Sequence, residues 1–137
     1  TSNNQNQTNS GIKQPLTKED SIYNEIIDIH DEVMAKMGKL IGYQKKAQYY
    51  SDSAKQAIKK HSMPDLSEYK QRMDSLFYDL KIAEKSMNDW MEQFNPDPKL
   101  PTTEEKVAYF KEQKAKALKM KEQFYIALEK GKKLLNE

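Results

Sequence analysis

The stretch that decides the fold is Leu66 to Phe94, "LSEYKQRMDSLFYDLKIAEKSMNDWMEQF". Its apolar side chains recur in alternating steps of three and four residues, which is the spacing of one face of an α-helix. The pattern is kept over about four heptads, so it predicts a long helix with a continuous apolar seam at about residues 65–95. The seam consists of Leu66, Tyr69, Met73, Leu76, Leu80, Ala83, Met87, Trp90 and Phe94.

Proline-containing segments bound this helix on both sides. The segment "SMPD" at residues 62–65 precedes it, and Asp65 is expected to cap its N-terminus. The segment "NPDPKLP" at residues 95–101 follows it, and its three prolines cannot continue a helix. Both segments are short, so the chain has to turn back on itself at each of them.

A second helix is predicted before this one, at residues 18–61. That range contains no proline, and its apolar residues again recur at steps of three and four. Acidic residues gather in its first half and lysines in its second half, which suits the helix dipole. Its stripe is Ile22, Ile26, Ile29, Val33, Met37, Leu40, and then more weakly Ala47, Tyr50, Ala54 and Ile58.

A third helix is predicted at residues 103–136. Thr102 and Glu105 have the spacing of a capping box, which marks a helix N-terminus. The apolar stripe that follows is broader than the seam, as expected for a helix that contacts two neighbours. Its members are Val107, Phe110, Ala117, Met120, Phe124, Ala127, Leu128, Leu134 and Leu135.

Three long apolar stripes joined by short connections predict an all-α fold, an antiparallel up-down-up three-helix bundle over residues 18–137. Residues 1–17 are polar and lack apolar periodicity, so they are expected to form a disordered tether. The 23 basic and 21 acidic residues nearly cancel and are interspersed, which does not favour a nucleic-acid partner. The absence of cysteine excludes disulfides and thiolate chemistry.

The stretch "IHDEVMAKMGKLIG", residues 29–42, holds the residues most suggestive of chemistry. His30, Met34 and Met37 lie on a second apolar row with Ile27 and Ile41, and imidazole and thioether groups suit Cu(I). Methionine at helical spacing ordinarily fills a core, so a histidine at the core border is the favoured interpretation.

The acidic and aromatic residues near this motif are predicted to be structural. Asp31 and Glu32 lie about 100 and 200 degrees around the helix from His30, so both are expected to be separate surface acids. No nucleophile, base and orienting group occur together, which predicts that the chain is not an enzyme and needs no cofactor. Trp90 continues the seam and is expected to anchor the core.

Gly38 and Gly42 lie one turn apart inside the first predicted helix, where each weakens a helix by about 1 kcal/mol relative to alanine. The close approach of another helix, or a bend, would explain them. A functional hinge is the alternative.

Three segments, "IHDEVMAKMGKL", "AEKSMNDWMEQF" and "YFKEQKAKALKMKEQF", resemble small helical lipoproteins of Bacteroidota, many of which are labelled "viral A-type inclusion protein". The resemblance covers about residues 22–135 and implies a three-helix domain exported to the cell envelope. It also implies a lipid anchor on a cysteine upstream of Thr1. His30, Asp31, Trp90 and Met91 match the family's motifs, but Ala35 stands where the family is expected to have proline. The family suggests no activity.

The sequence therefore favours a non-enzymatic binding or structural module of the bacterial cell envelope, periplasmic or on the outer membrane. A protein partner is possible, and contact with a membrane is expected only through the lipid anchor. The alternative is a periplasmic carrier of a metal or small ligand that uses His30, Met34 and Met37.

Overall fold

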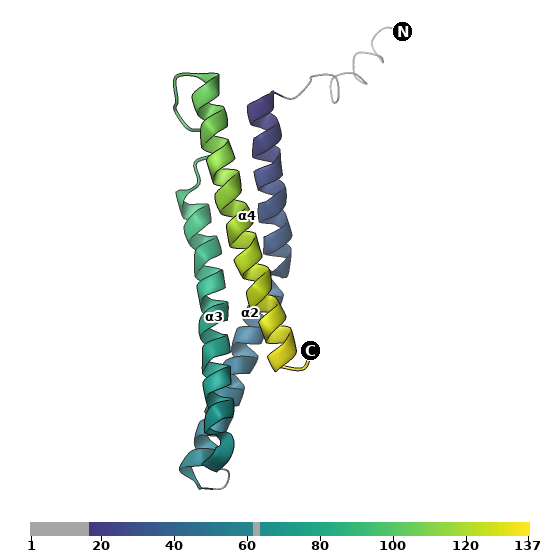
Figure 1. Cartoon of the computed structure of the whole chain (residues 1–137), viewed down its shortest axis with the longest axis vertical. Helices are drawn as coiled ribbons and strands as arrows, with labels where there is room; N and C mark the ends of the chain where they lie inside the picture. The colour runs from purple at the N-terminus through teal and green to yellow at the C-terminus, as the bar shows by residue number, and fades with distance from the viewer. Residues whose placement is uncertain (1–16, 62–63) are drawn as a thin grey trace, which may run out of the picture.

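The computed structural model describes residues 17–61 and 64–137. Three long helices, α2 (Lys18–Lys59), α3 (Ser67–Gln93) and α4 (Thr103–Leu134), pack against one another (Figure 1). A 3-10 turn, η1 (Pro64–Leu66), precedes α3, and the described residues contain no strand. The predicted all-α three-helix bundle is confirmed. The predicted tether lies outside the described residues except for Thr17.

The helix ends differ from the prediction by a few residues. Thr17 and Thr102 cap α2 and α4, each accepting a backbone N–H three residues later at 3.1 Å, as the sequence indicated for Thr102. Helix α2 ends at Lys59, and the next residue but one, His61, has a left-handed φ of 60°. The predicted cap Asp65 is wrong, because Asp65 lies in η1 and the residue before α3 is Leu66, which makes no side-chain cap.

Side-chain contacts fix the up-down-up topology and the register. Lys114 pairs with Glu25 and Lys121 with Glu32, both across an offset of 89 residues, so α2 and α4 run parallel. Gln44 of α2 donates to the Leu80 carbonyl of α3. As the residue number rises along α2, the number of the residue that it contacts on α3 falls. These two helices are therefore antiparallel.

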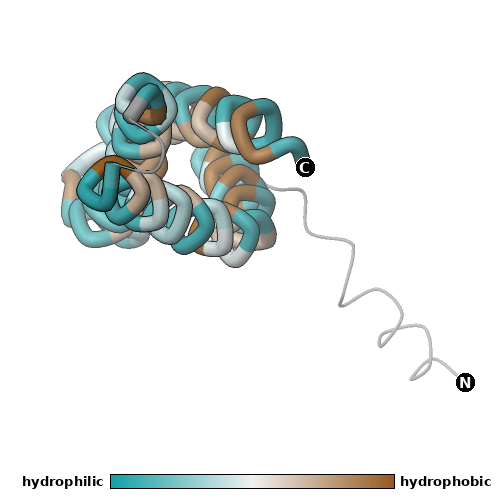
Figure 2. The backbone as a smooth tube through the Cα atoms, turned by 90° about the horizontal axis from the view of Figure 1, so that it is seen from below, coloured by the Kyte–Doolittle hydropathy of each residue, from teal (hydrophilic) through white to brown (hydrophobic). Residues whose placement is uncertain are grey.

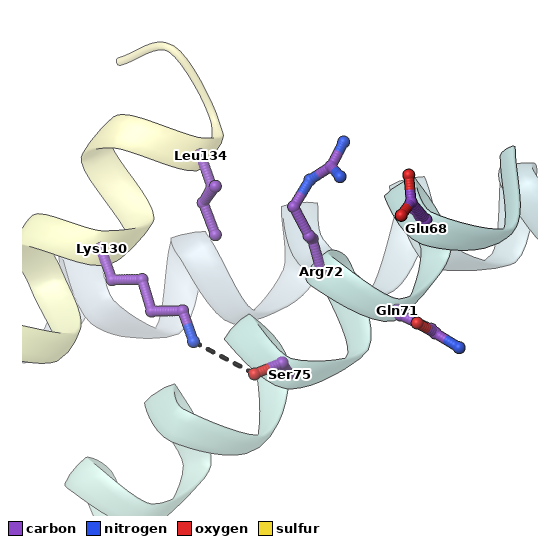
Figure 3. A pocket seen from close by; sticks show the side chains of 6 residues that line it. All are labelled: Glu68, Gln71, Arg72, Ser75, Lys130 and Leu134. Atoms are coloured by element: carbon purple, nitrogen blue, oxygen red, sulfur yellow. Dashed lines mark hydrogen bonds between the residues drawn. The ribbon is translucent and has the colours of Figure 1, made fainter.

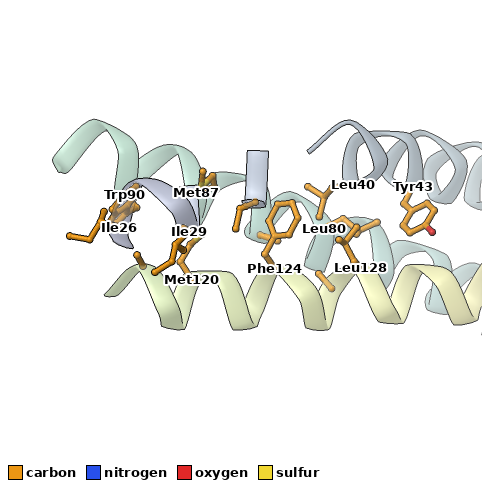
Figure 4. Packing of buried hydrophobic residues seen from close by; sticks show 14 of the residues in the cluster. Ile26, Ile29, Leu40, Tyr43, Leu80, Met87, Trp90, Met120, Phe124 and Leu128 are labelled. Carbon is orange, nitrogen blue, oxygen red and sulfur yellow. The ribbon is translucent and has the colours of Figure 1, made fainter. Parts of the chain in front are cut away.

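The core is one continuous apolar column between the three helices. In the end-on view of Figure 2, the helices surround a shared axis, and hydrophobic and hydrophilic residues alternate along each of them. Figure 4 shows Phe124 of α4 between Met120 and Leu128, facing side chains of the other two helices. The largest fully buried side chains are Phe124, Ile26, Leu40, Met73, Leu76, Leu80, Met87 and Val33.

Helix α2 extends past the end of α4. The offset of 89 residues places Leu134, the last residue of α4, opposite Lys45. Beyond that point α2 packs mainly on η1 and on the start of α3, where Ser51 donates to the Asp74 carboxylate. Figure 1 shows this lower part of α2 beside α3 and below the C-terminus. The molecule is therefore a three-helix bundle that continues as a two-helix end.

The buried face of α2 changes along this two-helix end. The predicted stripe member Tyr50 is exposed, and its neighbour Ser51 is buried instead. Gln44, which lies just before the two-helix end, is also buried although it did not belong to the predicted stripe, and it contacts α3 through the Leu80 carbonyl and Glu84. The physical reason is that a helix with one neighbour buries a face centred on that neighbour, whereas a helix with two neighbours buries a wider face between them.

The glycines of α2 are not sites of close helix approach. A Cβ atom added to Gly38 or Gly42 would meet nothing within 4 Å. The predicted close approach of another helix therefore does not explain the pair. The close approach occurs at Gly131 of α4, where an added Cβ would lie 2.5 Å from a ring carbon of Tyr43. The buried Tyr43 ring occupies the space that any side chain at position 131 would need.

Alanine substitutions separate these two kinds of glycine. Gly38→Ala and Gly42→Ala are each expected to raise the free energy of unfolding by about 0.5–1 kcal/mol, through helix propensity alone. Gly131→Ala is expected to lower it by about 1 kcal/mol, because overpacking costs about 1–3 kcal/mol and outweighs the same propensity gain. Urea unfolding measures all three, and a stabilising Gly131→Ala would contradict the contact with Tyr43.

Candidate functional site

His30 lies at the border of the core, where α2 meets α3. Its Nδ1 atom is 3.0 Å from a carboxylate oxygen of Asp31, and its Nε2 atom is 3.1 Å from the sulfur of Met91. The side chain of His30 is 29% exposed, so the cluster is reachable from solvent. The predicted border position of His30 is therefore confirmed, and its sulfur neighbour comes from a different helix than the sequence suggested.

The other two predicted metal ligands lie apart from this contact. Met34 is 39% exposed, and Met37 is partly buried against the core. Within the described residues, the hydrogen-bonding partners of His30 are Asp31 and Met91, and neither Met34 nor Met37 is among them. A sequence argument could find the i, i+4 and i+7 positions on one helix, but it could not find a partner on the facing helix.

The expectation that Asp31 points away from His30 is wrong. Helical periodicity fixes the direction of the Cα–Cβ bond, but an aspartate side chain can turn back toward the ring of its neighbour. The predicted surface position of Asp31 is nevertheless correct, because its carboxylate is mostly exposed.

Trp90 anchors the core beside this cluster, as predicted. Its ring stacks on Phe94 with the ring centroids 5.1 Å apart, and its centroid lies 6.4 Å from that of His30. Tyr23 and Phe110 extend the aromatic packing around Phe94. The buried Nε1 atom of Trp90 has no hydrogen-bond partner in the described part of the chain, which is a cost to folding of about 1–3 kcal/mol.

Glu32 takes part in packing between helices, not in chemistry with His30. It accepts hydrogen bonds from Lys121 at 2.9 Å and from the Tyr125 hydroxyl at 2.8 Å, and both residues lie on α4. These contacts, Lys121 first and Tyr125 second, hold the pKa of Glu32 below its usual value. Burial, and then the Glu32 carboxylate, raise the pKa of Tyr125. Glu32 is therefore a structural ion-pair partner.

A strip of exposed apolar side chains runs over the face shared by α3 and α4. Ile82 is 43% exposed and Ile126 is 62% exposed, and both line a groove of about 230 Å³ between the two helices. Tyr78, also exposed, lies one helical turn before Ile82. Tyr78 is not among the residues that line the groove, and we call Ile82 and Ile126 the α3–α4 strip. The sequence signal that could have revealed it was Ile82, a large apolar residue of α3 that lies outside the seam.

A second hollow, of about 420 Å³, lies where α4 ends beside α3 (Figure 3). Lys130 reaches across it and donates to the Ser75 hydroxyl at 3.1 Å. Figure 3 shows Arg72 and Glu68 farther along α3, so the charged groups do not converge on one point. This hollow offers no arrangement for acid–base or nucleophilic catalysis.

Across residues 17–61 and 64–137, no group of three or more His, Cys, Asp or Glu side chains is placed to hold a metal ion. None of the described helices is long and apolar enough to cross a membrane. No family model, curated protein or solved structure matches this chain.

Proposed function

We propose that this chain is a non-enzymatic helical module of the bacterial cell envelope that acts by binding another protein through the α3–α4 strip. The observation that carries the proposal is the exposure of Ile82 and Ile126 on one groove, although the seam and stripes bury most other large apolar residues. Apolar side chains that gather on one surface are typical of interaction sites, whereas single exposed ones are not.

The charges beside the strip indicate the kind of partner. Asp79 and Lys130 line the groove but pair with each other, and Asp89 pairs with Lys85. Lys116 and Lys119 of α4 line the neighbouring groove and make no ion pair within the described residues. A partner helix with an apolar face would place its own acidic residues toward these two lysines of α4. Helix-in-groove binding of this kind uses apolar anchors at steps of three and four residues.

The ion pairs between helices support the proposal that the chain is not an enzyme. Glu32 is paired with Lys121, Glu25 with Lys114 and Asp79 with Lys130, and each pair joins two helices. Carboxylates committed to such pairs are poor candidates for proton transfer. The hollow at the end of α4 likewise lacks convergent groups.

The assignment to the cell envelope rests on the resemblance to Bacteroidota lipoproteins and on the polar segment at residues 1–17. A lipid-anchored precursor is expected to incorporate a labelled fatty acid and to fractionate with membranes. Changing the cysteine expected upstream of Thr1 to serine should abolish both properties. An unlabelled precursor in the soluble fraction would contradict this location.

Site-specific photo-crosslinking in cells tests the binding surface. A photoreactive phenylalanine analogue at Ile126 is expected to give a crosslinked product of defined size, and Ile82→Lys in the same chain should reduce its yield at least about tenfold. Ile82 and Ile126 are exposed, so neither change should unfold the helices.

The matched control is the same analogue at Leu118, which is 44% exposed on α4 but does not line the groove. Equal crosslinking from Leu118 and Ile126, or none from Ile126, would overturn the proposed surface. A product with the mass of two copies of this chain would identify the partner as a second copy.

A further inference from the structure

The contact between His30 and Met91 presents a problem of hydrogen bonding. Carboxylate oxygens only accept hydrogen bonds, so the short contact to Asp31 requires the Nδ1 atom of His30 to carry a hydrogen. In a neutral imidazole the Nε2 atom then has a lone pair and no hydrogen. A thioether sulfur also offers only lone pairs, so in this neutral form two electron-pair donors face each other at 3.1 Å, whereas a protonated imidazole would donate its Nε2–H to the sulfur.

In the neutral form of His30, an electron-pair acceptor between the two atoms would satisfy both of them, in the place that a proton takes in the imidazolium. Imidazole nitrogen and thioether sulfur are both ligands that suit Cu(I), which is a soft ion. We propose that His30 Nε2 and Met91 Sδ form a binding site for a soft monovalent cation, Cu(I) by preference. This site is independent of the proposed partner surface, because it joins α2 to α3 and the α3–α4 strip lies elsewhere.

The surroundings of the two ligands support this assignment. Histidines that bind metals usually donate their other ring N–H to a carboxylate, which fixes the tautomer and makes the free nitrogen a better ligand. Asp31 supplies that carboxylate. Residues 30 and 31 of α2 and residues 90 and 91 of α3, which are far apart in sequence, thus form one site.

The site can adjust to an ion. Bonds from a metal to nitrogen and sulfur are about 2.0 and 2.3 Å long, so His30 Nε2 and Met91 Sδ have to separate from 3.1 Å to about 4.3 Å for an ion that lies directly between them. Methionine has three rotatable side-chain bonds, and Met91 is only partly buried, so this movement needs no change in the helices. Binding forms two dative bonds and transfers no electron.

Trp90 makes the site measurable. It is the only tryptophan of the chain, and its ring centroid lies 6.4 Å from that of His30. A cation bound by His30 is expected to quench the emission of Trp90. Titration with Ag(I), which resists oxidation, and with Cu(I) under anaerobic conditions against a coloured chelator should give one equivalent per chain.

Variants identify the ligands. Met91→Leu keeps the volume of the side chain and removes the sulfur, so it is expected to weaken binding at least about tenfold. Asp31→Ala removes the carboxylate from an exposed position and is expected to weaken binding about 10- to 100-fold. His30→Gln should abolish the quenching, and the helical circular dichroism of each variant confirms that it is folded.

The control variants carry the same methionine-to-leucine change elsewhere. Met87 lies one turn before Met91 on α3 and is fully buried, so Met87→Leu is the first control. Met34→Leu is the second, and it tests the ligand set that the sequence suggested. Both should bind as the original chain does. The proposal is overturned if neither ion binds, if Met91→Leu binds normally, or if all three leucine variants weaken binding equally.

Methyl NMR provides a second measurement. Ag(I) is expected to shift the Met91 methyl resonance far more than those of the other six methionines. A larger shift at Met34 or Met37 would also contradict the site. This readout does not depend on stability, so it separates ligation of the ion from a purely structural role of Met91.

Discussion

Replacing Phe124 with alanine is expected to lower the free energy of unfolding by about 3–5 kcal/mol, the usual cost of removing a buried phenylalanine. Phe124 is fully buried and lies about two-thirds of the way along α4, where all three helices contribute to the core (Figure 4). No other described side chain that is fully buried is larger. Since domains of this size are stable by about 5–15 kcal/mol, the loss is a large share of the total.

Guanidinium unfolding followed by circular dichroism measures this change. The matched control is Ile126→Ala, two residues later on the same helix, where the side chain is 62% exposed. This substitution should change the free energy of unfolding by no more than about 0.5 kcal/mol. If the two variants lost similar stability, the core would not be arranged around Phe124 as described.

The two-helix end is expected to open far more often than the rest of the bundle. Amide hydrogens of α2 residues 51–59 should exchange at least about 100-fold faster than those of residues 26–40. The physical reason is the small apolar area buried there. The buried residues of α2 in that range are Ser51 and Ala54, whereas Ile26, Val33 and Leu40 are fully buried in the three-helix part. Hydrogen exchange followed by NMR measures both ranges.

Proline substitutions test the same difference. Ser53→Pro should unwind the two-helix end but lower the global free energy of unfolding by less than about 1 kcal/mol. Lys39→Pro, at an exposed position of the same helix inside the three-helix part, should lower it by about 3 kcal/mol or more. Equal losses would mean that α2 unfolds as one unit and that the two-helix end has no separate stability.

Most of the fold could be predicted from local patterns. The seam of α3 and the cap at Thr102 each depend on residues close together in the chain, and both predictions are confirmed. The wrong predictions have a common cause. Tyr50, Asp65 and the Gly38–Gly42 pair were assigned from their own helices, but their environments depend on which helix lies opposite, or on the turn that joins α2 to α3.

The candidate site could be predicted only in part. His30 was placed correctly at the core border, but its sulfur neighbour was sought on α2, one or two turns away. Met91 is 61 residues distant and reaches His30 only because α2 and α3 are antiparallel in one register. The α3–α4 strip was not predicted, since exposure depends on where α4 lies beside α3.

The sequence by itself determined that this chain forms three long helices and which stripe of each faces inward, because hydrophobic periodicity and capping act over a few residues. Tertiary structure alone decided the offset of 89 residues between α2 and α4, the two-helix end, and the meeting of His30 with Met91. Those features depend on how side chains from different helices interlock, and no local pattern records that.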